Sequence, residues 1–479
     1  MKATVGPARD CPCLIAGRSL RASCPQLSAR PRRFAILASL APTARLSGHG
    51  QPRDSRSRRS AACIVRAVLL GLTLHAFATA GDWPQILGPL RTGVAAADER
   101  LADAWPATGL RQVWKRDVGA GVAGVAVVES RVFLFHRVGN REVLEALEAT
   151  TGETLWRDDH ATSFVPQVGG SDGPLCAPVV HDGKVVVFGA QGVLACIEAA
   201  SGRRLWERRT HRDYDAQEGY FGAGSTPLVV AGRVIVNVGG RKGDAGIVAF
   251  DLATGETLWT ATREGASYSA PVTVTVAGVE QVLMVTRLSC LLLDPADGSV
   301  RWSFPFGQRG PTVNAASPVL LGDAEFLVTA SYGIGSVCAA FDARGVTPRW
   351  QGTDALASQY ATPVFVAGSL YAIDGRDDVP PTSLVCLDPA TGKVRWREEG
   401  FGYGTLLVAD GKIVMTKTDG EALLVRPDAT RLDVLARARP FAGDVRGGPL
   451  RALPALANGR LYLRNDRTLV SLDVSPTGP

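Results

Sequence analysis

Cysteine is scarce beyond the first 80 residues of this chain, and its spacing argues against several kinds of site. Of the nine cysteines, the five that follow residue 80 are Cys176, Cys196, Cys290, Cys338 and Cys386. No C-x-x-C pair occurs among them, which argues against a cysteine-rich metal site and against covalent haem attachment. Their odd number also argues against a framework in which every cysteine forms a disulfide. We expect these residues to be small core side chains.

A hydrophobic run long enough to cross a bilayer is also missing. The apolar segment Ala67–Ala80 has 14 residues, and a spanning helix needs about 20. It follows Arg66 and ends in Ala78-Thr79-Ala80, so it has the charge, the apolar core and the small-residue exit of a secretory signal. We therefore expect a signal peptide at 63–80, cleaved near Ala80, and a periplasmic or extracellular protein that is not transmembrane after cleavage. An uncleaved anchor or a buried strand are the alternatives.

The first 62 residues lack any hydrophobic periodicity. They are rich in Arg, Ser and Pro, which predicts a disordered basic leader. A signal this far inside a chain favours a mis-assigned start, with the true beginning near Val65. An organelle transit peptide, which is also Arg- and Ser-rich and poor in acids, is the competing interpretation.

Residues 81–479 have no excess of positive charge, although the whole chain has a net charge of +6. Residues 1–80 contain thirteen basic and two acidic side chains, a net of +11, so residues 81–479 carry a net charge of −5. A mildly acidic body argues against a nucleic-acid-binding surface.

A short phrase ending in tryptophan is repeated six times along the chain. An acidic residue stands eight positions before each of these tryptophans, as in Asp251–Trp259 with the sequence DLATGETLW. The six tryptophans are Trp156, Trp206, Trp259, Trp302, Trp350 and Trp396. A β-rich repeat of about 45 residues predicts one small unit stacked many times, in which a large ring covers the seam with the next unit.

The third unit shows how one repeat is built. Leu228–Val230, Arg233–Val238 and Gly246–Phe250 alternate as strands, and a fourth begins at Thr257–Trp259. Short turns between them predict a four-stranded antiparallel sheet. The acid of the phrase is expected to accept a hydrogen bond from the backbone two residues on, so it is a turn device rather than a catalytic carboxylate.

Eight such units can be counted, the seventh ending near Leu435 in a degenerate phrase. The eighth has only three strands and ends at Leu469–Val474, and we expect Gln112–Lys115, with Trp114, to supply its fourth strand. The sequence therefore predicts an all-β, eight-bladed β-propeller closed by its N-terminal strand. The expected divisions are a leader segment 81–110, the propeller 111–474 and a tail 475–479.

The repeated phrase resembles that of the pyrroloquinoline-quinone (PQQ) enzyme propellers, and of the related outer-membrane-assembly propeller lipoprotein of bacteria. The start Asp82-Trp83-Pro84-Gln85 is similar to the leader of bacterial exported PQQ-like repeat proteins, although Ile86 and Leu87 differ from the residues usual there. The resemblance implies the fold, but one scaffold hosts enzymes and adaptors alike.

In the alcohol dehydrogenases that this repeat resembles, PQQ lies between a Trp and a disulfide of adjacent cysteines, and a Ca²⁺ polarises it. The body of this chain has no adjacent cysteines, and its repeat tryptophans are assigned to seams. We therefore expect no cofactor and no catalytic residues, and a scaffold that binds an envelope protein or a polysaccharide, as a monomer. A PQQ-dependent alcohol or sugar dehydrogenase with Ca²⁺ and a divergent site is the alternative.

A ligand site, if present, is expected at the central funnel, which the segments before each first strand would line. Tyr268, Tyr360, Tyr403 and Arg451 occupy the same repeat position in four units, and Asn314 and Gln359 stand nearby. Aromatic faces with hydrogen-bonding groups suit a sugar, a peptide or a flat small molecule. Alternatively, these tyrosines only pack on one another and plug the channel.

Two further sets of residues are weaker candidates for a metal or cation site. His136, His160, His181 and His211 show no metal-ligand spacing, and we expect most of them at the surface. The acidic run 374–378 is a loose candidate for cation binding, although a solvated loop is the simpler interpretation.

Overall fold

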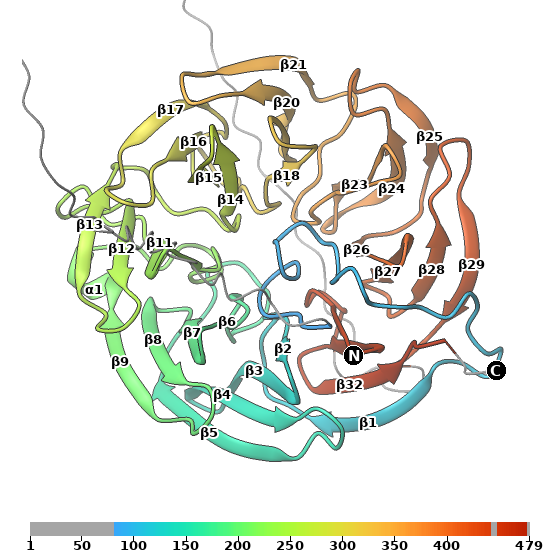
Figure 1. Cartoon of the computed structure of the whole chain (residues 1–479), viewed down its shortest axis with the longest axis horizontal. Coiled ribbons are helices and arrows are strands. Elements are labelled where there is room, and N and C mark those ends of the chain that lie inside the picture. The colour runs from blue at the N-terminus through green and yellow to red at the C-terminus, as the bar shows by residue number, and fades with distance from the viewer. Residues whose placement is uncertain (1–80, 442–447, 477–479) are drawn as a thin grey trace, which may run out of the picture. The chain divides into compact units, whose positions relative to one another are not determined.

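The computed structural model describes residues 81–441 and 448–476 of the 479-residue chain. Within them, eight four-stranded sheets form a ring (Figure 1), which confirms the predicted eight-bladed propeller. The predicted basic leader 1–62 and signal peptide 63–80 lie outside the described residues. No helix in the described ranges is both long enough and apolar enough to cross a bilayer.

The first four blades follow the chain in order. Blade one contains β2 (Ala126–Val128), β3 (Arg131–Val138), β4 (Arg141–Glu148) and β5 (Thr154–Ala161). Blade two contains β6 (Val179–His181), β7 (Lys184–Phe188), β8 (Val193–Glu198) and β9 (Arg204–Arg209), and the helix α1 (Thr210–Tyr214) follows it. Blade three contains β10 (Leu228–Val230), β11 (Arg233–Asn237), β12 (Ile247–Asp251) and β13 (Thr257–Ala261). Blade four contains β14 (Val272–Val276), β15 (Val279–Val285), β16 (Ser289–Leu293) and β17 (Val300–Pro305).

The last four blades complete the ring. Blade five contains β18 (Val319–Leu320), β19 (Glu325–Ala330), β20 (Gly335–Phe341) and β21 (Val346–Gly352). Blade six contains β22 (Val364–Val366), β23 (Ser369–Arg376), β24 (Val379–Leu387) and β25 (Val394–Glu398). Blade seven contains β26 (Gly404–Ala409), β27 (Lys412–Lys417), β28 (Ala422–Arg426) and β29 (Asp433–Ala438). Blade eight contains β30 (Ala455–Ala457), β31 (Arg460–Arg464) and β32 (Thr468–Asp473), with β1 (Arg111–Asp117) as its outer strand.

The ring closes where the sequence predicts. Strand β1 pairs antiparallel with β32, so that Trp114 lies opposite Ser471 and Asp117 opposite Thr468. This pairing joins the two ends of the propeller in one sheet and gives the last blade its fourth strand.

The hydrophobic core lies in the seams between blades. Seven clusters of buried apolar side chains each combine residues of neighbouring blades, and the largest spans blades seven, eight and one. The five cysteines are free and buried, as expected for small core residues.

Seven tryptophans bridge the seams in one recurring geometry. Each indole Nε1 donates a hydrogen bond to a carbonyl in the turn between the third and fourth strands of the next blade, and the acceptors, starting from Trp114, belong to Ala149, Ala199, Leu252, Pro295, Asp342, Pro389 and Asp428. In blades three to six the aspartate of the phrase holds the turn, as in blade three, where Asp251 Oδ1 accepts hydrogen bonds from the backbone N–H groups of Ala253 and Thr254 at 2.9 and 2.8 Å. These aspartates are the predicted turn device, whereas Glu148 and Glu198 of blades one and two accept from the hydroxyls of Thr150 and Ser201.

A glycine in most of these turns lies under the tryptophan ring. Gly255 has φ +72°, and a Cβ placed there would be 2.6 Å from the ring of Trp206. Glycine is therefore required both for the left-handed backbone and for the close approach of the ring.

Blade seven lacks this tryptophan for a topological reason. Ala436 pairs with Leu424 next to the same register shift at which Trp396 pairs with Cys386 one blade earlier. Blade eight takes its outer strand from the other end of the chain, so it has no turn between third and fourth strands for an indole to reach. Ring closure therefore explains why the seventh phrase has no tryptophan, although its turn still accepts the indole of Trp396 at Asp428 O.

The leader segment runs inside the ring, where Figure 1 shows it in blue. Trp83 forms a β-bridge with Val127 of blade one, and Val94 forms one with Val408 of blade seven. The leader also follows the turns between first and second strands: Asp82 accepts a hydrogen bond from Glu129 N at 2.8 Å, and Glu99 accepts one from Gly459 N at 3.0 Å. It therefore covers the ring centre along the edge that carries these turns.

Arg91 anchors the leader to blades three and four. Its guanidinium donates to the carbonyls of Thr226 and Pro271 at 3.4 and 3.0 Å and also to that of Pro227. Only 2% of the residue is exposed, and this burial lowers the pKa of Arg91 to about 9. Carbonyl oxygens rather than a carboxylate therefore solvate this buried cation.

Two of the four histidines contradict the expectation of surface positions. His136 and His160 are buried in blade one, where His136 Nε2 lies 3.3 Å from Glu145 and His160 Nε2 lies 2.8 Å from Glu142. Both glutamates are also buried, Glu145 beside Arg116 of blade eight and Glu142 beside Ala190 of blade two, so polar pairs lie in two seams where the sequence pattern predicts apolar residues.

Candidate functional site

The connections between blades and the hairpins between second and third strands lie at one edge of the ring, because the strands of each blade alternate in direction. We call this edge the funnel face; among its segments are 162–178, 210–227, 262–271, 306–318, 353–363 and 399–403. The leader follows the opposite edge. Any site built from the non-repeated residues of these connections therefore opens on the funnel face.

Four of the six predicted funnel residues form one cluster across blades six, seven and eight. The rings of Tyr360 and Tyr403 pack with their centroids 4.4 Å apart. Asp377 joins the cluster, since its Oδ2 accepts hydrogen bonds from Tyr360 Oη at 3.1 Å and from Arg451 Nε at 2.7 Å. Gln359 fixes the same hairpin by accepting a hydrogen bond from Asp377 N at 2.8 Å.

The hydrogen bonds of this tyrosine cluster, defined as Gln359, Tyr360, Asp377, Tyr403 and Arg451, are directed inward. The Tyr403 hydroxyl accepts hydrogen bonds from the backbone N–H groups of Tyr360 and Ala361 at 2.8 and 2.9 Å. Burial, with further contributions from Tyr403 and Asp377, raises the pKa of Tyr360 well above 10. Both phenols therefore stay neutral at physiological pH and act as packing and hydrogen-bonding groups.

The acidic run 374–378 is neutralised by arginines. Asp374 pairs with Arg397 at 2.7 Å, and Asp377 pairs with Arg451. Asp378 pairs with Arg376, whose guanidinium lies 4.4 Å above the ring of Tyr332. Across the described residues, no group of three or more His, Cys, Asp or Glu side chains is arranged as metal ligands.

Tyr268 lies apart from this cluster and lines a pocket of about 530 Å³ at blades three and four. The hydroxyl of Tyr268 accepts a hydrogen bond from Phe221 N at 3.1 Å, and the two rings meet edge to face at 5.8 Å. The volume falls within the range of roughly 300–1,000 Å³ that is common for ligand pockets.

The sixth predicted residue, Asn314, is a structural residue beside this pocket. Its Nδ2 donates to the carbonyls of Thr286 and Phe306 at 2.9 and 3.1 Å. Its backbone carbonyl accepts the N–H of Tyr268 at 2.9 Å, so Asn314 holds the pocket tyrosine without lining the cavity.

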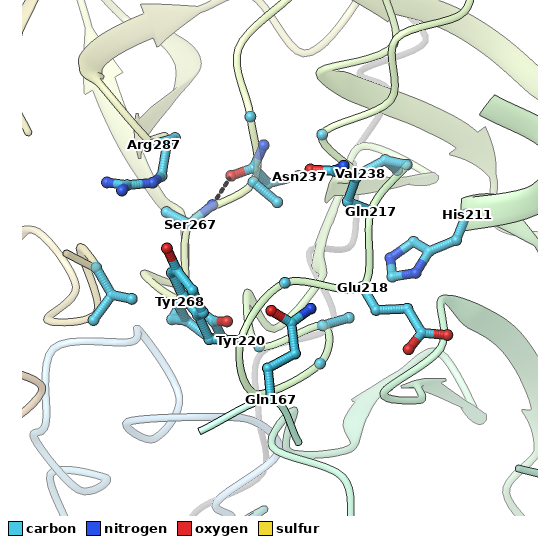
Figure 2. Close-up of a pocket in the computed structure, with 18 of the residues that line it drawn as sticks. Gln167, His211, Gln217, Glu218, Tyr220, Asn237, Val238, Ser267, Tyr268 and Arg287 are labelled. Carbon is cyan, nitrogen blue, oxygen red and sulfur yellow. Dashed lines mark hydrogen bonds between the residues drawn. The ribbon is translucent and has the colours of Figure 1, made fainter. Parts of the chain in front are cut away.

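Figure 2 shows the pocket walls, with Arg287 and Tyr268 on one side and His211 and Glu218 on the other. Arg287, Asn237 and Gln167 were not predicted from the sequence. Arg287 comes from a hairpin and Gln167 from a connection between blades, whose lengths differ from blade to blade, and Asn237 ends strand β11, where the repeat pattern does not mark it as a pocket residue. Asn237 is locked in place: its Oδ1 accepts from Ser267 N and its Nδ2 donates to Gly246 O, both at 2.9 Å.

The charges in the pocket are asymmetric. Burial lowers the pKa of His211 to about 4, so this imidazole is neutral at pH 7. Glu218 is the acid of the lining, against the three arginines Arg241, Arg263 and Arg287. The pocket therefore has a net positive lining and can hold an anionic group.

The described residues do not fit PQQ in the arrangement that the family resemblance implies. All nine tryptophans of the chain are accounted for: seven bridge seams, while Trp83 and Trp105 are buried with the leader. The cysteines after residue 80 are free, buried and separated in sequence, so none forms a disulfide of adjacent cysteines.

Comparison with known proteins gives two groups of relatives. BamB, an outer membrane protein assembly factor of Burkholderia pseudomallei, is 29% identical over 314 residues, covering 62% of this chain and 72% of BamB. The 1-butanol dehydrogenase (cytochrome c) of Thauera butanivorans is 34% identical over 197 residues, covering 37% of this chain and 26% of the dehydrogenase. The chain thus spans about a quarter of the length of that dehydrogenase.

Solved structures support the same fold. BamB from Moraxella catarrhalis aligns with a TM-score of 0.55 at 16% identity, over 76% of this chain and 99% of that one. A europium-containing methanol dehydrogenase aligns with a TM-score of 0.57 at 13% identity, over 81% of this chain and 90% of that one. At such identities the likeness shows the fold alone.

The family follows from a match to more than half of the chain. The family model described as outer membrane protein assembly factor BamB matches residues 139–397, which contain β4 and β5 of blade one and run through blades two to six to within one residue of the end of β25. With the seam tryptophans and the eight four-stranded blades, this match shows that the chain belongs to the family of PQQ-like repeat propellers described by BamB.

Proposed function

We propose that this chain is an exported, non-catalytic propeller scaffold that binds a protein partner at its funnel face, in the periplasm or outside the cell. One observation carries the proposal: the leader covers the ring centre along one edge, while the pocket at Tyr268 opens among the connections of the other. The BamB relatives are named outer membrane protein assembly factors, which supports an envelope protein as the partner.

The surface chemistry of the funnel face supports a protein partner. Val165 and Val168 are 73% and 55% exposed on the connection between blades one and two. Gln167 between them lines the pocket, and its backbone N–H donates to Tyr220 O at 2.9 Å. Exposed apolar side chains next to a polar pocket are common at protein interfaces.

The test is capture of partners from the bacterial envelope fraction by the purified chain and two variants. V168D places a charge on the funnel face, and K393E places one in an exposed turn of the opposite edge as the matched control. The proposal predicts a protein that the chain and K393E capture and that V168D loses. A polysaccharide retained in its place, or a protein captured equally by all three, contradicts the proposal.

Export is tested separately by fusing residues 1–80 to a phosphatase that is active only outside the cytoplasm. The expected result is activity in cells, which an Arg substitution for Leu70 in the apolar run abolishes. Activity that persists in that variant contradicts a cleaved signal at 63–80.

Local similarity to the butanol dehydrogenase makes a PQQ-dependent alcohol or sugar dehydrogenase the second candidate. Adding PQQ and Ca²⁺ to the purified chain with a panel of alcohols and sugars tests it by dye-linked oxidation. The scaffold proposal predicts no turnover and no rise of the melting temperature with PQQ, since a ligand of the native state would raise that temperature. Turnover with any substrate favours the dehydrogenase.

A further inference from the structure

Arg287 carries a positive charge that no acidic side chain of the described residues neutralises. Its Nη1 donates to Gln308 O and to Thr312 Oγ1, both at 3.0 Å, and its Nη2 donates to Gly310 O at 2.7 Å. A guanidinium has five N–H donors, so these three bonds leave the Nε–H and one N–H of Nη2. Arg287 is therefore held rigidly at the pocket wall with two donors available to a ligand.

The other two arginines of the lining differ from Arg287. Arg263 is paired with Asp244 at 2.5 Å, and Arg241 lies in the exposed hairpin between β11 and β12. Neither is fixed by carbonyl oxygens in the way that Arg287 is. A carboxylate is the natural ligand of a fixed guanidinium edge, because two parallel N–H···O bonds can form.

The wall opposite Arg287 carries the acidic Glu218 and a neutral histidine, so it repels a second anionic group of a ligand. Glu218 accepts a hydrogen bond from Gln191 Nε2 at 2.6 Å, and His211 beside it is neutral because burial lowers its pKa. His211 Nδ1 is buried and makes no hydrogen bond within the described part of the chain. The pocket therefore favours a molecule with a carboxylate at one end and neutral or hydrogen-bond-donating groups at the other (Figure 2).

Apolar groups are available next to the charge, one in the lining and two beside a lining residue in the sequence. The ring of Tyr268 stands beside Arg287 in the lining, and Val165 and Val168 are exposed on either side of Gln167. A neutral sugar could accept hydrogen bonds from the guanidinium, but it would leave the charge of Arg287 uncompensated and the exposed valines without an apolar partner. A peptide segment offers a carboxylate, backbone N–H groups and apolar side chains in one extended chain.

We propose that this pocket binds a carboxylate of an extended peptide segment of the partner, with the carboxylate on Arg287 and neighbouring apolar side chains on Tyr268, Val165 and Val168. The inference rests on the proposed scaffold function and names the chemistry of its partner. The carboxylate has two sources, the free C-terminus of a chain or an internal Asp or Glu.

Three pools of pentapeptides randomised over apolar residues distinguish these sources. The first pool ends in a free carboxylate, the second is amidated with a central Glu, and the third is amidated without an acid. Binding to the purified chain is followed by fluorescence polarisation. The inference predicts binding of the first or the second pool, but not the third, and the preferred pool identifies the source.

Substitution of Arg287 tests whether this side chain binds the carboxylate. R287M removes the charge and should weaken binding of the preferred pool by about tenfold to a hundredfold, the range for loss of a charge-assisted pair. R287K keeps the charge without the planar edge, so it should recover only part of the affinity. R376M is the matched control, since Arg376 ends β23 on the same face but is paired with Asp378. It should bind as the unmodified chain does.

Equal binding of all three pools, or unchanged binding by a folded R287M, overturns the inference. Preferential binding of an oligosaccharide of uronic acids in place of the peptides overturns it as well. If R287M is misfolded by circular dichroism, R287K and the salt dependence of binding decide: affinity of the acid pools that does not fall between 50 and 200 mM salt rejects an ionic contact.

The two proposals fail in different ways. If the envelope partner is lost by V168D but kept by folded R287M, the scaffold function stands and the carboxylate site is wrong. If the acid pools bind through Arg287 but no envelope protein is captured by the chain, the site stands and the scaffold function is wrong.

Discussion

The outer seams and the funnel face are built from the same eight repeats, yet they use them in opposite ways. At the seams, seven indoles make the same hydrogen bond to the same turn of the next blade. At the funnel face, tyrosines of one repeat position have different surroundings: Tyr403 is enclosed in the tyrosine cluster, while Tyr268 lines an open pocket.

The difference shows which positions in a repeat protein are free to vary. A seam residue must fit a neighbour that is itself a repeat, so each unit constrains the next. A funnel residue meets connections whose lengths differ from blade to blade, so identical side chains acquire different partners. Specific binding therefore has to come from the connections.

The largest expected effect breaks a seam. G255A places a Cβ 2.6 Å from the Trp206 ring at φ +72°, whereas G232A has φ +73° and meets nothing within 4 Å. Both variants should lose about 1–2 kcal/mol to left-handed strain, and only G255A should lose a further 1–3 kcal/mol or so to overpacking. Equal midpoints of urea unfolding for the two variants would show that the ring contact contributes nothing.

A smaller effect is expected inside the tyrosine cluster. Y403F leaves the N–H groups of Tyr360 and Ala361 without their acceptor, so about 1–3 kcal/mol of unfolding free energy should be lost. Y360F is the control, because Asp377 keeps its bond to Arg451 when the Tyr360 hydroxyl is removed. A larger loss in Y360F would contradict the assignment of Tyr403 as the buried acceptor.

Acid should destabilise the buried Glu145–His136 pair of blade one. Burial opposes ionisation of Glu145, but the hydrogen bond to His136 and the charge of Arg116 lower its pKa to about 2. Because the folded pKa lies below the ordinary value of 4.5, the stability that Glu145 contributes is present above pH 4.5 and is lost as the pH falls toward 2. Burial also lowers the pKa of His136, which acts in the same direction below pH 6.5.

Thermal unfolding from pH 7 to pH 2 checks this expectation. E145Q should be less stable than the unmodified chain at pH 7 and should show a flatter pH dependence below 4.5. E198Q, at a solvated surface pair with Arg203 at 2.9 Å, should differ little from the unmodified chain. A pH dependence that is unchanged in E145Q would remove Glu145 as its source.

The smallest effect on stability is expected at the pocket. Y268F removes a hydroxyl that accepts one hydrogen bond, from Phe221 N at 3.1 Å, so the loss should be about 1 kcal/mol. Differential scanning calorimetry beside Y403F tests the comparison directly. If Y268F destabilises the chain more than Y403F, Tyr268 is a structural plug and the contrast between the two regions fails.

Much of the fold follows from the repeated phrase, since the spacing of acid, glycine and tryptophan predicts strands, turns and ring closure. Parts of the funnel were also predictable, because Tyr360 and Tyr403 share a repeat position and do meet. The partners of these residues were not: Asp377 was interpreted as part of a solvated loop, and Arg287 was not singled out. His136 and His160 were predicted wrongly, because a buried histidine depends on a glutamate across the sheet rather than on its own local sequence.

The sequence by itself determined the eight-bladed ring, since every unit repeats a local pattern whose apolar face only another copy can cover. Tertiary structure alone decided which of these arginines has no acidic partner. Asp377 and Asp378 neutralise Arg451 and Arg376, while Arg287 is surrounded by carbonyl oxygens. The physical reason is that a charge is compensated by groups within a few ångströms in space, and in a propeller those groups come from separate blades and connections of unequal length.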